Sequence, residues 1–192
     1  MIGLFNFYKK DREKKIIQLK EFIEKETKVS LIDLESQLEE IDGIVLSGSE
    51  RLITEGEYKE EWLEFIRHSN IPIIGICFGF QLICQAFGAV FEHGENIKKS
   101  IEVKKLREHP LFNGIPATAI LPESHEEYVI AIMDPLIPLM LSDSCIEAIV
   151  HQDKPIYGTQ FHFERSKEYG NIILNNFLNI IKYNRINLNK YE

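Results

Sequence analysis

The sequence has little of what marks secreted, membrane or nucleic-acid-binding proteins. It contains three cysteines, an odd number without framework spacing, which argues against a disulfide scaffold and favours a reducing cytoplasm. No apolar run approaches the roughly 18 to 20 residues of a membrane span, and the opening residues do not have the pattern of a signal peptide. Acidic residues outnumber basic ones by 30 to 22, and the net charge of −8 argues against nucleic acid as a partner.

What remains fits one compact enzyme domain. Hydrophobic residues make up 44% of the chain, enough to bury a full core at this length, so we expect residues 1–192 to form a single domain. The sequence has no phosphate-cradling Gly-x-x-x-x-Gly-Lys loop. We expect neither a cofactor nor a metal.

Strand and helix patterns alternate in the first half of the chain, which predicts an α/β fold with a mainly parallel central sheet flanked by helices. Short strand patterns follow one another closely in the second half, which predicts antiparallel pairing there. The expected helices cover 9–28, 57–68, 78–88 and 166–183, and the expected strands cover 1–7, 29–34, 43–46, 71–76, 101–106, 118–121, 128–132, 145–150 and 156–161.

Cys77 stands where an apolar strand changes abruptly to an apolar helix, with Gly75 and Gly79 two residues away on either side. This is the pattern of a nucleophile elbow, in which small flanking residues let the chain turn sharply beneath a reactive side chain. The turn also places the thiol at a helix N-terminus, where the helix dipole favours the thiolate. Cys84 and Cys145 have no such setting and are expected to act as small buried hydrophobes.

The segment Gly75-Ile76-Cys77-Phe78-Gly79-Phe80-Gln81 resembles the nucleophile motif of class I, triad-type glutamine amidotransferases. Further along, residues 156–164 resemble the strand of that family that ends in its His-Pro-Glu segment. Upstream, residues 44–49 resemble its oxyanion-loop strand. The three motifs occur in the family's order and span most of the chain, and the resemblance implies a flavodoxin-like fold.

The resemblance implies a catalytic triad of Cys77, His162 and Glu164. Cys77 would attack the side-chain amide carbon of glutamine, and His162 would carry the proton to the departing ammonia. Because alternate residues of a strand share a face, we expect Glu164 to orient His162 from two residues along the same strand.

The resemblance also places an oxyanion hole at the amide of Phe78 and at the turn of Gly48 and Ser49. Two segments depart from the family pattern. Ser49-Glu50 replaces the usual Gly-Pro, and a side chain at Ser49 restricts positive φ, so we expect a hole of different shape or one that forms only on activation. Phe163 replaces the proline between the histidine and the glutamate, a minor change.

Three further residues are candidates for substrate binding by the same resemblance. Gln81, on the first turn after the elbow, would hold glutamine; alternatively it is a polar residue of the helix surface. Ser124 and His125 lie in a stretch similar to the Ser-His-x-Asp-x-Val segment of amidotransferases of the GMP synthetase kind. There the segment lines the glutamine pocket; the alternative is a short acidic loop before a strand.

Family resemblance implies that the chain hydrolyses L-glutamine and passes ammonia to a separate, ATP-dependent synthase subunit. The downstream motifs are most similar to the stand-alone glutaminase subunit of two-chain GMP synthetases, whereas residues 5–10 lack the segment that usually follows their first strand. Two other hypotheses stay open. The chain could be a triad hydrolase for another γ-glutamyl or amide substrate without ammonia channelling, or a catalytically weak regulatory subunit.

Overall fold

The computed structural model describes residues 1–188, with side chains described as far as residue 184. Its strands are β1 (Ile2–Phe5), β2 (Val29–Ile32), β3 (Gly43–Leu46), β4 (Ile73–Ile76), β5 (Val90–Ile97), β6 (Ser100–Lys105), β7 (Thr118–Pro122), β8 (His125–Ala131), β9 (Leu136–Leu141), β10 (Ile146–His151) and β11 (Ile156–Thr159). Its α-helices are α1 (Arg12–Glu24), α2 (Glu60–His68), α3 (Phe78–Ala86) and α4 (Gly170–Leu188). The predicted α/β fold is confirmed.

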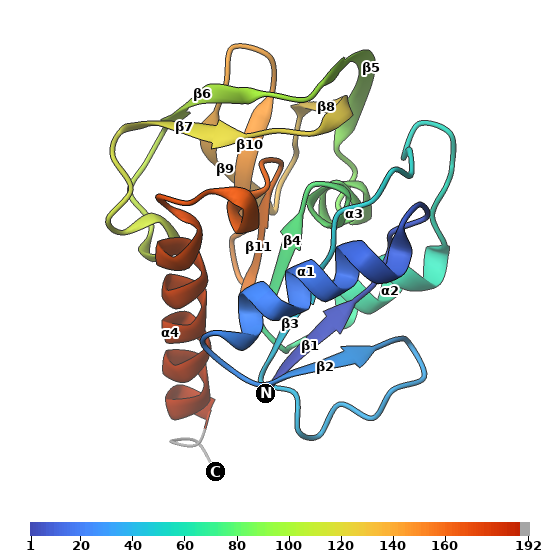
Figure 1. The fold of residues 1–192 in the computed structure, drawn as a ribbon, viewed down its shortest axis with the longest axis vertical. Coiled ribbons are helices and arrows are strands. Elements are labelled where there is room, and N and C mark those ends of the chain that lie inside the picture. The colour runs from blue at the N-terminus through green and yellow to red at the C-terminus, as the bar shows by residue number, and fades with distance from the viewer. Residues whose placement is uncertain (189–192) are drawn as a thin grey trace.

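One nine-stranded sheet runs through the molecule in the order β2-β1-β3-β4-β11-β10-β9-β6-β7 (Figure 1). The strands from β2 to β11 pair in parallel. From β11 to β7 every pairing is antiparallel. The last strand in sequence, β11, therefore lies at the junction of the two halves and brings the C-terminal motif beside the strand that leads to Cys77.

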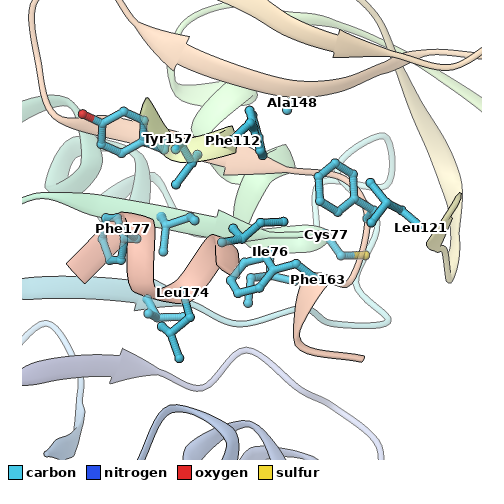
Figure 2. Packing of buried hydrophobic residues seen from close by; sticks show 14 of the residues in the cluster. Ile76, Cys77, Phe112, Leu121, Ala148, Tyr157, Phe163, Leu174 and Phe177 are labelled. Atoms are coloured by element: carbon cyan, nitrogen blue, oxygen red, sulfur yellow. The ribbon is translucent and has the colours of Figure 1, made fainter. Parts of the chain in front are cut away.

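Helices cover both faces of the parallel half. On one face, Leu19 of α1 and Phe177 of α4 belong to a buried cluster with Ile76 and Phe163 (Figure 2). On the other face, Leu63 of α2 and Phe80 of α3 form a second cluster with Leu46 and Ile73. The strands between these layers, such as β3 and β4, are buried at every position, which explains their unbroken apolar sequences.

Two strands were not predicted. β5 is mostly exposed and carries polar residues such as Glu92, His93 and Glu95; it pairs antiparallel with β8 in a separate two-stranded ribbon. β9 contains Pro138, a residue that normally weakens a strand assignment, and its register with β10 shifts near that position. β5 lacks the alternation or apolar run on which strand prediction depends, and the apolar run of β9 is broken by its proline.

Most predicted elements are present with shifted ends. The helix expected over 9–28 begins at Arg12, and the one expected over 57–68 begins at Glu60. The strand expected over 156–161 ends at Thr159, which matters for the site described below. Within residues 1–188, no helix is long and apolar enough to cross a membrane.

Candidate active site

Cys77 occupies a sharp turn between β4 and α3, as the glycine pattern predicts. Its backbone has φ 51° and ψ −105°, a strained conformation for a residue with a side chain, and its amide donates to the carbonyl of Thr159 at 2.8 Å. A Cβ on Gly75 would lie 2.4 Å from the carbonyl carbon of Gly79, and one on Gly79 would lie 2.4 Å from the carbonyl oxygen of Leu46. Both glycines are therefore required by close packing around the elbow.

His162 and Glu164 meet beyond the end of β11 rather than on it, so the expectation that they share a strand is wrong. His162 precedes a single 3₁₀ turn, Phe163–Arg165, and its amide donates to the carbonyl of Pro122 at 2.8 Å. The turn folds the carboxylate back, and His162 Nδ1 lies 2.7 Å from Glu164 Oε1. This contact leaves Nε2 of the imidazole for Cys77, which helps to raise the pKa of the histidine.

Charges within the triad support one another. Burial alone would lower the pKa of His162, but the Glu164 carboxylate and Cys77 outweigh it and raise that pKa to about 9. Burial would likewise raise the pKa of Glu164, yet His162 and Arg165 hold it below its usual value. Glu164 is thus ionised at neutral pH and favours a protonated His162.

The predicted oxyanion turn lies beside the triad. A Cβ on Gly48 would be 3.0 Å from Cε1 of His162 and 3.6 Å from Cβ of Cys77. In the described part of the chain, none of the backbone amides of Gly48, Ser49 and Phe78 donates to another protein group. All three are therefore free to meet an anionic oxygen.

Ser49 avoids the strain that its side chain would cause. Among the described residues outside glycine, positive φ is confined to Asp11 and Cys77, so the Ser49 backbone lies outside the left-handed region. Its hydroxyl donates to the carbonyl of Phe7 at 2.7 Å and accepts from the amide of Arg51 at 3.2 Å. The serine ties the turn to the carboxyl end of β1, a restraint that a glycine would not supply.

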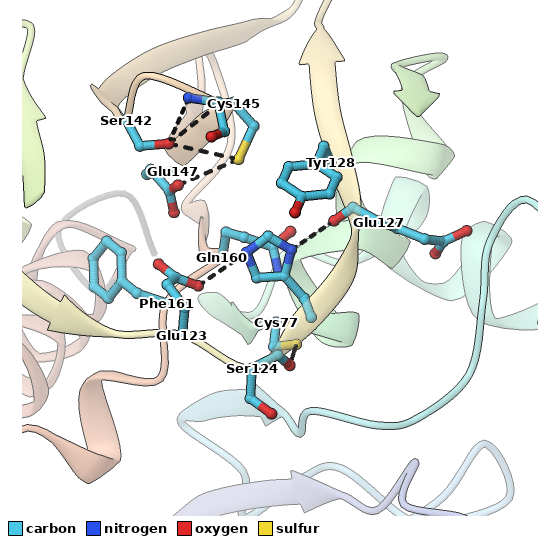
Figure 3. Close-up of polar contacts among 12 residues, drawn as sticks. Cys77, Glu123, Ser124, Glu127, Tyr128, Ser142, Cys145, Glu147, Gln160 and Phe161 are labelled. Carbon is cyan, nitrogen blue, oxygen red and sulfur yellow. Dashed lines mark hydrogen bonds and ion pairs between the residues drawn. The ribbon is translucent and has the colours of Figure 1, made fainter. Parts of the chain in front are cut away.

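A cavity of about 440 Å³ opens onto Cys77 and His162. Ser49, Gln81, Ser124 and His125 line it. The Cys77 thiol donates to the carbonyl of Ser124 at 3.6 Å, so the backbone of this segment borders the nucleophile (Figure 3). The structure therefore places Cys77, His162 and four of the six candidate binding residues around one space, whereas Gly48, Phe78 and Glu164 do not line it.

Gln81 and His125 are held by protein groups. Gln81 is buried and donates from Nε2 to the carbonyl of Glu127 at 3.2 Å and to Oε1 of Gln160 at 3.1 Å. His125 is the first residue of β8, and its Nδ1 lies 2.9 Å from the same carbonyl of Glu127. Neither residue is a solvated surface group, and a direct contact of either side chain with substrate stays a prediction.

Sequence reasoning missed Tyr8, which follows β1 and lines the cavity. Its hydroxyl would lie 3.7 Å from a Cβ on Gly48, the same position that lies close to His162 and Cys77. Burial and the Glu164 carboxylate raise its pKa, so it is a neutral hydroxyl at working pH. Its place at the carboxyl end of a parallel strand, where ligands bind in such folds, was the available signal.

Glu127 was also missed, although it occupies the acidic position of the Ser-His-x-Asp-like stretch. Its carboxylate is buried and accepts from the amides of Ile53 and Thr54, each at 2.7 Å. These bonds join the loop that follows Ser49 to the strand that follows Ser124. Glu127 therefore fixes the distance between two walls of the cavity.

The sequence profile of the class "Glutamine amidotransferase class-I" matches residues 10–181. The chain belongs to this family. Its relatives include a subunit of the glutamine-hydrolysing GMP synthase of Pyrococcus furiosus, 39% identical over 72% of this chain and 74% of that one. The corresponding GMP synthase subunit of Methanococcus maripaludis is 41% identical over 72% of each chain.

Solved structures agree with this assignment. A Thermoplasma acidophilum protein described as a GMP synthase subunit superposes with a TM-score of 0.83 at 27% identity, covering 98% of this chain and 96% of its own. A glutamine amidotransferase from Thermotoga maritima has a TM-score of 0.72 at 19% identity, covering 94% of this chain and 97% of its own, and shows the shared fold. The predicted family and its fold are confirmed.

Proposed function

We propose that this amidotransferase hydrolyses L-glutamine to glutamate and ammonia through a Cys77-His162-Glu164 triad. Cys77 sulfur attacks the side-chain amide carbon, and the resulting oxyanion is met by the amide of Phe78 and one from the Gly48-Ser49 turn. His162 gives a proton to the departing nitrogen, ammonia leaves, and a γ-glutamyl thioester remains on Cys77. Water activated by His162 then attacks the thioester, which releases glutamate and restores the thiol.

One observation carries this proposal. The strained elbow presents Cys77 to His162, and Glu164 holds the other nitrogen of that ring at 2.7 Å. A cysteine, a histidine and a carboxylate thus stand in the order that a nucleophile, its base and an orienting group require. A regulatory subunit without activity would not need a strained backbone at the nucleophile.

The proposed partner is a separate ATP-dependent synthase that consumes the ammonia, of the kind that makes GMP. The support is that relatives at about 40% identity are named as one subunit of a glutamine-hydrolysing GMP synthase. This chain covers about three quarters of the length of those relatives. We propose that it serves as the glutaminase component in the same way and that it works in the cytoplasm.

Covalent labelling tests the nucleophile and the substrate together. The purified chain is incubated with an electrophilic glutamine analogue, with and without excess glutamine, and is then analysed by intact mass and peptide mapping. We expect a single adduct on Cys77 that glutamine suppresses. An adduct on Cys77 that glutamine does not suppress but another γ-glutamyl compound does would support the triad hydrolase instead.

The partner is tested by adding the synthase subunit from the same organism with its ATP and nucleotide substrate. We expect glutamine-dependent formation of GMP and a faster release of glutamate than the isolated chain shows. A chain labelled on Cys77 should support GMP formation from free ammonium but not from glutamine. Failure of glutamine to support GMP formation with the unlabelled chain would overturn the proposed partnership.

A further inference from the structure

Behind the triad lies a group of buried ionisable side chains that the proposed reaction does not use. Glu123 follows β7, His125 begins β8, Glu147 lies in β10, and Cys145 precedes that strand (Figure 3). The whole residues are between 0% and 7% exposed. Two buried glutamates in mutual contact are unusual, because an unpaired carboxylate in such a place costs several kcal/mol.

The contacts among these side chains form a single series from Cys145 to the carbonyl of Glu127. Cys145 Sγ donates to Glu147 Oε1 at 3.2 Å, and the carboxyl groups of Glu147 and Glu123 lie close enough for each to shift the pKa of the other. Glu123 Oε2 lies 3.2 Å from His125 Nε2. His125 Nδ1 lies 2.9 Å from the carbonyl of Glu127, and since a carbonyl only accepts, Nδ1 carries the hydrogen.

Burial lowers the pKa of His125, which favours the neutral ring, and the neutral ring sets the other protons of the series. A neutral His125 with hydrogen on Nδ1 has a bare Nε2, which needs a donor, and Glu123 can donate only as a carboxylic acid. Glu147 is also protonated, because two carboxylates beside each other in a buried place would repel each other. A protonated Glu147 can donate to the other oxygen of Glu123. Every hydrogen in the series, from Cys145 to the carbonyl of Glu127, finds an acceptor.

We infer that Glu123 and Glu147 are neutral carboxylic acids at pH 7 and, with His125, act as positioning residues that hold the 122–125 segment against the nucleophile and the base. The backbone of that segment contacts both. The carbonyl of Ser124 accepts from the Cys77 thiol, and the carbonyl of Pro122 accepts from the amide of His162. Glu123 and His125 are the sequence neighbours of Ser124. Their side chains hold the segment from the side that faces away from Cys77 and His162.

The surroundings favour this protonation. Burial is the main cause that raises the pKa of Glu123 and of Glu147, each to about 8, and burial lowers the pKa of His125. The ionised Glu164 adds to the effect on Glu123. Tyr128 also faces the pair, and burial raises its pKa. Among the described residues, no group of acidic, histidine or cysteine side chains is arranged to hold a metal ion, so protons are the groups that neutralise these acids.

Infrared difference spectroscopy tests the protonation directly. At pH 7 the spectrum of the wild-type protein should contain the C=O stretching band of protonated carboxylic acids, and Glu123→Gln and Glu147→Gln should each remove part of it. Glu102→Gln, at an exposed position on β6, is the matched control and should leave the band intact. An acid band that neither buried variant changes would overturn the inference, whatever the activity of the protein.

Activity then tests the positioning role, which rests on the proposed function. Glutamine can accept and donate as a carboxylic acid does, so Glu147→Gln should keep at least about a third of kcat/KM, whereas Glu147→Leu should lose about tenfold or more. The double variant Glu123→Gln/Glu147→Gln should also lack the fall in kcat/KM that loss of these protons causes near pH 8 in the wild type. Glutamine variants as poor as leucine variants, in protein that folds normally, would overturn the inference.

Discussion

The two halves of the sheet divide the work of this enzyme between them. The parallel half ends in the elbow of Cys77 and in the Gly48-Ser49 turn, so it supplies the proposed nucleophile and the candidate oxyanion amides. The antiparallel half, together with the start of β8 that follows β7, supplies the wall that faces them, from Pro122 to Glu127, and the buried carboxyl groups beneath that wall. The comparison teaches that local backbone geometry determines the position of the reacting group, whereas the pairing of strands distant in sequence determines its surroundings.

Replacing the nucleophile should have the largest effect. Cys77→Ala should lower kcat for glutamine hydrolysis by a factor of about 10⁶, as in hydrolases that lose the triad nucleophile. Cys84→Ala is the matched control: it removes a fully buried thiol from α3 and should cost stability but leave turnover largely intact. Glutamate release in a steady-state assay measures both, and an equal loss in the two variants would disprove the role of Cys77.

Replacing the orienting carboxylate should have the next largest effect. Glu164→Gln should lower kcat by about 10³ to 10⁴, because the imidazole loses the partner that fixes its tautomer. The pKa of His162, about 9 in the wild type, should fall because the main group that raises it is gone. The limb of the kcat/KM profile that His162 controls should move to lower pH. A profile that stays in place would show that Glu164 does not act through His162.

The packing of the elbow can be broken without touching a reactive group. Gly79→Ala would place a Cβ 2.4 Å from the Leu46 carbonyl, and we expect it to lower the free energy of unfolding by about 1–3 kcal/mol and to reduce labelling of Cys77. Gly56→Ala is a control with φ 69° and open space around the new methyl group. It should cost about 1–2 kcal/mol through the backbone alone. Denaturant unfolding measures both, and normal labelling in Gly79→Ala would contradict the steric account.

The smallest expected effect comes from the antiparallel half, as a pH dependence of the free energy of unfolding. The pKa values of Glu123 and Glu147 are raised from 4.5 to about 8, so between these values the folded chain binds more protons than the unfolded chain. Their contribution is therefore complete below about pH 4.5 and is lost as pH rises to about 8, by at most about 1.4 kcal/mol per pH unit for each proton.

The double variant Glu123→Gln/Glu147→Gln has no such protons to lose. Its stability relative to the wild type should therefore rise steadily from pH 5 to pH 8, as measured by urea unfolding at several pH values. A constant difference across this range would show that the two acids are ionised in the folded protein.

The same division explains what the sequence could predict. The elbow was predictable because Gly75, Cys77 and Gly79 are neighbours in sequence and their sterics are local. The sequence predicted that His162 pairs with Glu164 but not the backbone that brings them together. The strand ends at Thr159, and a 3₁₀ turn makes the contact. The freedom of Ser49 from positive φ was not predictable from its neighbours.

The buried acids lay beyond prediction for a different reason. Glu123 and Glu147 are far apart in sequence, and they meet only because β7 and β10 take particular places in the sheet. That order depends on β9, a strand with an internal proline that sequence patterns do not favour. Glu147 stands among apolar neighbours, and the sequence alone predicts it at an ordinary exposed position of a strand. In the fold it is fully buried.

Trapping the covalent intermediate tests the central claim most directly. The chain is mixed with glutamine, quenched with acid within the first turnover, digested and analysed by mass spectrometry. We predict a γ-glutamyl thioester on the peptide that contains Cys77, absent from Cys77→Ala and present in Cys84→Ala. An acyl group on another residue, or turnover of glutamine with no acylated peptide in any variant, would contradict it.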